Sequence, residues 1–413
     1  DWQPYRSTPY AHHPPLLNVL DALVGLVPGE STVQLRLVPF LLALSAVPTA
    51  TWLLRTLGVG WRSTLMSVAA MAATGFYWVY GQVMVDLGPI LAVAASTVAL
   101  RRRDPTDRRV RVAAVTALLA CLTSWPGIAF SVVLVAAMAV RHRDRATGTV
   151  AAAAAAGIAT SLAFMVGAGG ASDLGQQVGE RTGGSTSIGR LVDVVAHDAG
   201  ELLPSWYMVM LPVAVAVGLV DRRTRFLTVL SSLFAAGWVL VLPDGAIVHD
   251  YWAYLVLIPG LLGMAAVADK ALDRLDRPRF VPTTVTALVA TLLLGSFLTM
   301  VIGDDADVYV DRPTQAGRLI ETAVIPADQR FAWSVGFTDL RVLSYYLDRP
   351  TRVLTDVELA DLADDELIFV DLERLPGWYP VVTAPVAVQR RDGFAFVRAD
   401  TLRESLDDDP AQR

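Results

Sequence analysis

The sequence predicts an all-α polytopic membrane protein with about ten transmembrane helices and a small C-terminal α/β domain. Hydrophobic residues make up 54% of the chain, charged residues only 18%, and the mean hydropathy is +0.47. Soluble domains carry about 25% charged residues. Apolar runs of about 17–20 residues recur up to residue 303, and a run of that length crosses a bilayer as a helix.

The charge distribution predicts a domain boundary after residue 303. Residues 1–303 carry 22 basic and 18 acidic side chains, whereas residues 304–413 carry 12 and 22. An acidic tail of this kind argues against nucleic acid or anionic lipid as its partner. The single cysteine, Cys121, lies in an apolar run and excludes an intramolecular disulfide.

The first element is an amphipathic helix over about 16–27, ended by Pro28-Gly29. A Trp125-Pro126-Gly127 break splits 112–140 into two membrane helices. The remaining spans are expected near 37–54, 63–80, 86–100, 149–168, 203–220, 226–242, 252–268 and 283–302.

Basic residues alternate between the loops, and this alternation predicts the orientation. The loops near residues 55–62, 101–111, 141–145, 222–225 and 270–279 hold 18 of the 22 basic residues before position 304. The positive-inside rule places these loops in the cytoplasm. The opposite loops and the tail are then extracytoplasmic, which predicts a multi-pass protein of the plasma membrane. The Arg clusters themselves are interpreted as topology determinants.

The residue pattern of the tail, residues 304–413, predicts alternating strands and helices. Strands are expected at 331–335, 352–354 and 367–370, with helical patterns at 338–347 and 357–364 between them. A hairpin follows, with strands at 386–389 and 394–397. The sequence contains no Walker motif, no HExxH and no CxxC, so it gives no support to soluble nucleotide chemistry or zinc hydrolysis.

A stiff polar turn near the start carries the first candidate site residues. Pro14 and Pro15 follow His12 and His13 and hold them in extended backbone, with Tyr10 and Arg6 just upstream. The simpler interpretation is a polar loop that caps a membrane helix. The alternative is a set of protonatable groups held at the membrane surface beside the amphipathic helix.

Asp86 is the second candidate, at the start of an expected span. It could cap this helix, with Pro89 in the first turn, or it could act on a substrate. The two roles are compatible.

The stretch from His249 through Asp250, Tyr251 and Trp252 opens a later span and is the third candidate. Tyr251, Trp252 and Tyr254 are also what an interfacial aromatic belt contains. Trp206 and Tyr207 are interpreted as belt residues too. A belt does not explain His249, which is expected on the same membrane face as His12 and His13.

These residues resemble the first outer loop and later motifs of the polyprenyl-phosphate-sugar-dependent GT-C glycosyltransferases, the protein O-mannosyltransferase-like and aminoarabinose-transferase-like enzymes. The similar segments are Pro9-Tyr10, the run from His12 to Leu16, Arg36 with Pro39, Asp86, and the stretch from His249 to Trp252 with Pro259. The order of spans and the C-terminal domain on the far side are similar as well.

The resemblance has one departure. In this family the main catalytic carboxylate follows a first membrane helix, and Asp1 does not match that position. The resemblance therefore implies that the sequence is N-terminally truncated and lacks that helix and its general base.

The resemblance implies an inverting transferase of the lipid bilayer. Its donor would be a sugar, hexosyl (as in a mannosyltransferase) or pentosyl, on a polyprenyl phosphate, and its extracytoplasmic acceptor a protein, a lipid or a cell-wall glycan. It implies Asp86 as an acid/base or acceptor-orienting group. His13, assisted by His249 or Arg6, would stabilise the phosphate, with His12, Tyr10, Asp250 and Tyr251 as further donor-binding candidates. The resemblance establishes no cofactor and leaves open whether a divalent metal ion binds. The sequence shows no cluster of three or more metal ligands.

Two other classes compete with this interpretation. A transporter or flippase of lipid-linked sugars should contain internal repeats and polar residues in mid-span, and the sequence shows neither an obvious repeat nor that polar pattern. A non-catalytic scaffold whose tail binds an outside partner would depend on His13, Asp86 and His249 for stability alone.

Overall fold

The computed structural model describes residues 14–24, 26, 32–75, 85–102, 106–169, 187–248 and 250–274, together with five strands and residues 399–400 near the C-terminus and isolated positions elsewhere. The chain divides into two compact units. The larger spans Tyr10–Gly303, and the smaller contains Asp304–Arg413 together with Asp1–Pro9.

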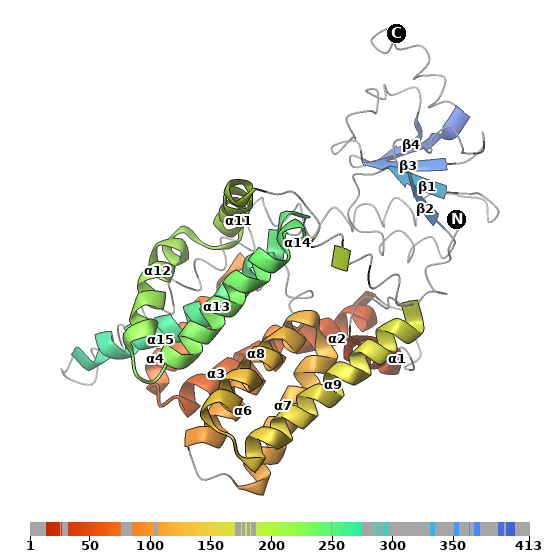
Figure 1. Ribbon diagram of the computed structural model, residues 1–413. Coiled ribbons are helices and arrows are strands. Elements are labelled where there is room, and N and C mark those ends of the chain that lie inside the picture. Colours follow the sequence, from red (N-terminus) through yellow and green to blue (C-terminus); the bar gives the residue numbers. More distant parts are fainter. Residues whose placement is uncertain are drawn as a thin grey trace. The chain divides into compact units, whose positions relative to one another are not determined.

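The larger unit is a bundle of helices (Figure 1). In chain order they are α1 (Leu16–Val24), α2 (Thr32–Leu44), α3 (Ala46–Thr56), α4 (Trp61–Ala72), α6 (Leu87–Arg102), α7 (Asp107–Thr123), α8 (Trp125–Arg141), α9 (Arg145–Gly169), α11 (Ile188–Leu202), α12 (Ser205–Val220), α13 (Arg225–Val241), α14 (Pro243–Val248), the 3-10 helix η1 (Asp250–Val256) and α15 (Leu257–Arg274).

Three stretches in the described part of the chain are long and apolar enough to cross a membrane: Leu37–Thr56, Arg145–Gly167 and Trp252–Arg274. A fourth is present if the bent pair Ile188–Gly200 and Ser205–Val220 counts as one span. Helices lie at each expected span from 37–54 to 252–268. The last expected span, 283–302, falls mostly outside the described residues, so the number ten stays a prediction.

The break within 112–140 is confirmed. Helix α7 ends at Thr123, and Ser124 adopts an extended conformation as the N-cap of α8, where its side chain accepts a hydrogen bond from the Gly127 N–H. Pro126 lies in the first turn of α8, where a missing N–H costs nothing. A Cβ on residue 127 would lie 2.2 Å from the Ala120 carbonyl oxygen, so glycine permits the tight reversal.

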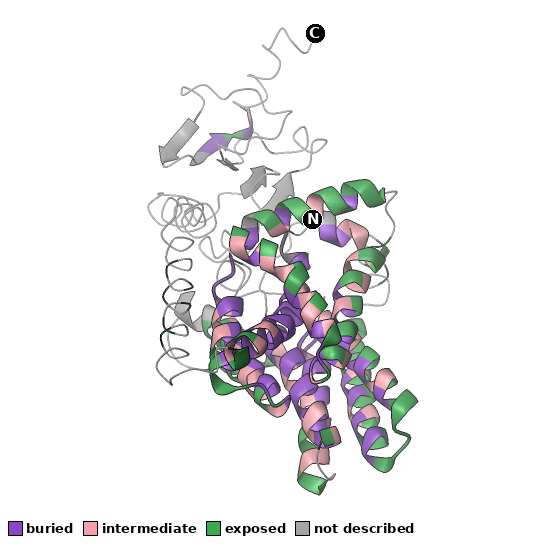
Figure 2. Cartoon of the chain, turned by 90° about the vertical axis from the view of Figure 1, so that its left-hand side faces the viewer, coloured by how far each residue is buried: buried purple, intermediate pink, exposed green. Residues whose placement is uncertain are grey.

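Helix α15 is the central helix of the bundle. Of the membrane-length window in Trp252–Arg274, 72% is buried, against 28% in Arg145–Gly167. Buried residues face the interior of the bundle, and exposed ones lie on its outer faces (Figure 2). Glycine lets α15 approach α12 closely, since a Cβ on Gly263 would lie 2.2 Å from the Ala214 carbonyl oxygen. Small residues at such contacts are the usual means of packing helices in a membrane.

Charged groups join the loops at one end of this bundle. The buried carboxylate of Asp269, on α15, accepts hydrogen bonds from the Gly60 N–H (3.0 Å) and the Ser63 hydroxyl (2.7 Å) ahead of and within α4. Its other oxygen pairs with Arg223 at 2.6 Å. Helix α15, the start of α4 and the loop ahead of α13, which are distant in sequence, are thus tied together by one carboxylate.

Other arginines extend this network. Arg102, at the end of α6, donates to the Leu57 carbonyl (2.6 Å) and to the Arg223 carbonyl (3.3 Å). Arg101 pairs with Asp144 at 2.6 Å. The Arg-rich loops expected on one membrane face therefore lie at one end of the bundle, and several arginines there make specific contacts beyond any effect on topology. We call this the basic end.

The smaller unit contains a five-stranded sheet with strands β1 (Phe331–Ser334), β2 (Thr351–Leu354), β3 (Leu367–Asp371), β4 (Ala387–Arg391) and β5 (Phe394–Arg398) in the order β2-β1-β3-β5-β4. The first three strands are parallel, and β3, β5 and β4 are antiparallel neighbours. The five expected strands and the hairpin are confirmed. The helical patterns at 338–347 and 357–364 lie almost wholly outside the described residues, so the α/β character stays a prediction.

The contact between α12 and α15 predicts a sharp difference between two Gly-to-Ala changes. In Gly263→Ala, the new methyl group meets the backbone of Ala214, which cannot rotate away, so we expect a loss of about 1–3 kcal/mol and a lower thermal unfolding midpoint in detergent. Gly237→Ala in α13 is the matched control, since its Cβ meets nothing within 4 Å. This control should keep or raise the midpoint. Equal midpoints for the two variants would contradict the packing.

Candidate functional site

Asp86 immediately precedes α6 and is buried, with 3% of its surface exposed. Its carbonyl accepts the Ile90 N–H at 2.9 Å, so it occupies the cap position expected from the sequence. Pro89 has no N–H, which removes the donor that a capping side chain usually accepts from the third helical residue. The carboxylate is therefore available for other partners.

Tyr254 of η1 is one such partner. Its hydroxyl donates a 2.5 Å hydrogen bond to Oδ2 of Asp86, which joins two segments 168 residues apart. Both side chains are buried, and Oδ1 of Asp86 has no hydrogen-bond partner among the residues that the structure describes. A buried carboxylate oxygen without a donor is costly, and such groups gather at functional sites.

Ser124 lies next to the same carboxyl group. Its oxygen accepts the Gly127 N–H at 3.0 Å, so its own hydroxyl hydrogen can point to Asp86. The start of α6, the break between α7 and α8, and η1 thus meet around one carboxylate. They lie at the end of the bundle away from the basic end, because α6 and α8 each run from one end to the other.

The aromatic-belt interpretation is wrong for Trp252, Tyr254 and Tyr207, which are all buried within the protein. Trp252 packs against Trp238, with ring centroids 5.6 Å apart, and against Gly245. The hydroxyl of Tyr207 lies against Gly260. Burial separates these residues from lipid, and in Tyr254 it serves the contact with Asp86.

Two of the three expected site regions therefore meet: the Asp86 segment and the segment from Asp250 onward. The backbone of Asp250 and Tyr251 lies in η1, and nothing is described of their side chains. Arg6, Tyr10, His12, His13 and His249 lie outside the described residues. Tyr254 and Ser124 were not expected to contact Asp86.

An apolar groove lies between α1 and α2, with a volume of about 410 Å³. Its lining is wholly aliphatic: Leu20, Leu23, Val24, Val38, Leu41 and Leu42. Leu42 also adjoins Gly88, two residues after Asp86, where a Cβ would lie 3.1 Å from the Leu42 carbonyl oxygen. Helix α2, which lines one side of the groove, thus contacts the first turn of the helix that follows Asp86.

Asp21 of α1 is another carboxylate of interest. It is half-buried, and the sequence analysis did not identify it. Partial burial raises the pKa of Asp21 to about 6. Its Oδ1 has no hydrogen-bond partner within the described part of the chain. The available sequence signal was a charged residue in a mostly aliphatic helix. Among the described residues, no group of three or more His, Cys, Asp and Glu side chains is arranged to hold a metal ion.

Comparisons with solved structures identify the fold. The chain aligns with ArnT from Cupriavidus metallidurans bound to undecaprenyl phosphate at a TM-score of 0.64 and 14% identity, covering 97% of this chain and 90% of ArnT. The apo state of that ArnT aligns at a TM-score of 0.59 and 16% identity, covering 97% and 91%. The sequence matches no family model and no curated protein. The fold is the GT-C fold that the sequence resemblance implies.

The contact between Tyr254 and Asp86 predicts that two Tyr-to-Phe changes differ in their effect on the free energy of unfolding. Tyr254→Phe removes the donor from a buried carboxylate and should cost about 1–3 kcal/mol. Tyr207→Phe is the matched control, since its buried hydroxyl has no partner in the described part of the chain and its removal should be close to neutral. Thermal unfolding of the two variants in detergent checks this. A larger loss for Tyr207→Phe would contradict the assigned contact.

The raised pKa of Asp21 predicts a pH-dependent stability. The folded state holds the proton more tightly than the unfolded state, so this contribution is fully present below about pH 4 and is lost as the pH rises through about 6. Asp21→Asn should therefore raise the unfolding midpoint at pH 8 and change it little at pH 4. Asp193→Asn, at an exposed position of α11, is the control and should show no such trend. An equal gain at both pH values would contradict the raised pKa.

Proposed function

We propose that this chain is an integral membrane glycosyltransferase that moves a sugar from a polyprenyl phosphate to an extracytoplasmic acceptor, with inversion at the anomeric carbon. One observation carries the proposal. The buried pair of Asp86 and Tyr254 lies in a fold shared over 97% of the chain with ArnT, whose structure contains undecaprenyl phosphate. The same unit offers an aliphatic groove between α1 and α2, and a polar centre together with an apolar groove suits a sugar on a lipid.

The groove between α1 and α2 is our candidate for the prenyl chain. Its lining offers only branched aliphatic side chains, and such a surface favours a hydrocarbon over a sugar or a peptide. Because Leu42 of the groove adjoins Gly88, a chain lying there would bring its phosphate toward the segment that carries Asp86.

Asp86 is our candidate for a group that acts on the acceptor. Tyr254 holds Oδ2, and Oδ1, beside the Ser124 hydroxyl, is our candidate to accept a hydrogen bond from the acceptor hydroxyl or amine. The acceptor atom attacks the anomeric carbon, the bond from that carbon to the phosphate oxygen breaks, and polyprenyl phosphate leaves. Asp86 orients the attacking group or shares in taking its proton.

The leaving phosphate needs donors that stabilise its charge. We propose His13 for this role, with His249 or Arg6 assisting. His12, Tyr10, Asp250 and Tyr251 are proposed to complete the donor site. Histidine and tyrosine side chains donate hydrogen bonds when neutral, and arginine donates at any ordinary pH. Asp250 instead offers acceptor oxygens that suit sugar hydroxyls.

The orientation belongs to the same proposal. With the basic end in the cytoplasm, as the positive-inside rule favours, Asp86 faces the extracytoplasmic side of the plasma membrane. About ten spans then carry the chain back to that side, and the C-terminal unit is an extracytoplasmic α/β domain after residue 303.

A transfer assay tests the function. The purified protein is incubated with a radiolabelled polyprenyl-phosphate sugar and a mixture of envelope acceptors, beside Asp86→Asn. We expect the turnover of Asp86→Asn to fall at least about 100-fold, as for loss of a group that handles the acceptor proton. Asp144→Asn, a carboxylate change at the basic end, is the control and should keep its turnover.

Normal transfer by Asp86→Asn would remove the assigned site and leave the function standing. Donor binding without transfer by the unaltered protein would instead favour a transporter or flippase of lipid-linked sugars.

A further inference from the structure

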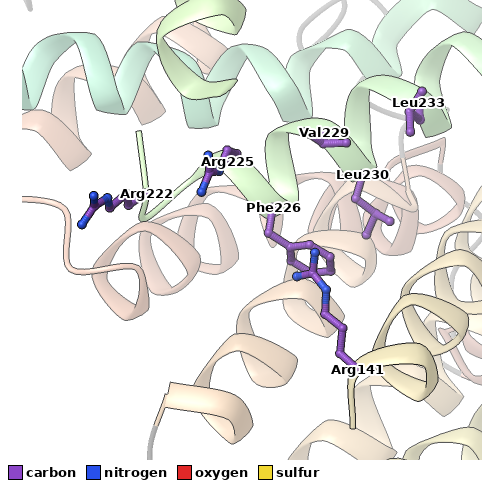
Figure 3. A pocket seen from close by; sticks show the side chains of 7 residues that line it. All are labelled: Arg141, Arg222, Arg225, Phe226, Val229, Leu230 and Leu233. Carbon is purple, nitrogen blue, oxygen red and sulfur yellow. The ribbon is translucent and has the colours of Figure 1, made fainter. Parts of the chain in front are cut away.

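A second groove lies at the basic end, between the C-terminal end of α8 and the first half of α13 (Figure 3). Its volume is about 440 Å³. It is lined by Arg141 of α8, Arg222 just ahead of α13, and five residues of α13: Arg225, Phe226, Val229, Leu230 and Leu233. No part of the proposed transfer reaction uses it.

The polar end of this groove carries three guanidinium groups. Arg141 lies over the Phe226 ring, 4.3 Å from its centroid. Within the described part of the chain, Arg141, Arg222 and Arg225 have no carboxylate partner, because the acidic groups nearby are engaged elsewhere. Asp144 pairs with Arg101, and Asp221 and Asp269 both pair with Arg223. The charge of the groove is therefore uncompensated by the described residues.

The other end of the groove is apolar and open. Val229 and Leu233 follow Phe226 along one face of α13 at helical spacing, and they are 40% and 69% exposed. In the orientation proposed above, these two residues lie deeper in the membrane than the arginines. The groove thus offers cations at the membrane surface and a hydrocarbon-lined channel beneath them.

We propose that this groove binds an anionic phospholipid of the cytoplasmic leaflet. Arg141, Arg222 and Arg225 supply the positive charge that attracts the phosphate, since guanidinium groups bind phosphate oxygens in pairs and resist deprotonation. One acyl chain lies along Phe226, Val229 and Leu233. Basic pockets between membrane helices on this side are the setting in which anionic headgroups bind.

The charge pattern favours a lipid over a soluble anion or a protein segment. A soluble phosphate has no use for the apolar channel, and a polar peptide would leave backbone groups unsatisfied beside Val229 and Leu233. The proposal rests on the membrane orientation of the proposed function. It does not depend on the transfer reaction.

Native mass spectrometry of the full-length protein in a non-ionic detergent tests this inference. Phosphatidylglycerol and phosphatidylcholine with the same acyl chains are titrated separately. We expect the first phosphatidylglycerol to bind at least tenfold more tightly than phosphatidylcholine. The triple variant Arg141→Ala, Arg222→Ala, Arg225→Ala should lose this preference, and the same three positions changed to Lys should recover part of it.

Arg108→Ala, Arg143→Ala, Arg145→Ala is the matched control, because it removes the same charge at the same end outside the groove. This control should retain the tight site. A second variant, Val229→Trp, fills the channel at an exposed position and should weaken phosphatidylglycerol binding even if the triple Ala variant fails to fold. Equal weakening in the control or equal binding of phosphatidylcholine would each overturn the proposal. None of these outcomes bears on whether the protein transfers sugar.

Discussion

The hydrogen bond from Tyr254 to Asp86 is the interaction on which the proposed site depends. A carboxylate buried to 3% exposure carries a large desolvation cost, and a short hydrogen bond from a buried phenol offsets part of it. The bond also fixes how η1 meets the start of α6. Without it, the start of α6 and η1, ahead of the central helix α15, would lose this buried polar contact.

The bundle separates two kinds of chemistry between its ends. At one end lies a buried carboxylate whose Oδ1 has no hydrogen-bond partner among the described residues, and an aliphatic groove lies between α1 and α2 of the same bundle. At the other, Asp269 and Asp221 neutralise Arg223, and three further arginines gather around an open groove. Close helix packing, such as that of Gly263 on Ala214, lets residues distant in sequence converge at each end.

Local signals made much of the fold predictable. The Trp125-Pro126-Gly127 break was visible in the sequence, because proline and glycine act through the backbone of their own turn. The five strands followed from alternation and turn residues in the same way. Asp86 was identifiable as a carboxylate at a helix start.

The contacts of the site were not predictable from one sequence, since they join segments far apart. Tyr254 has the same neighbours as a belt tyrosine would have, and only its burial against Asp86 distinguishes the two roles. Asp21 is hidden in an aliphatic helix. The arginines of the basic end look alike in sequence, and only their partners separate Arg223, which pairs with carboxylates, from Arg222 and Arg225, which line a groove.

A double-mutant cycle in the transfer assay tests the central claim most directly. Turnover is measured for the unaltered protein, Asp86→Asn, Tyr254→Phe and the double variant. If the two side chains act as one unit on the acceptor, the double variant should be little slower than Asp86→Asn alone, with a coupling energy of about 1–3 kcal/mol. Additive losses in the double variant would contradict the account.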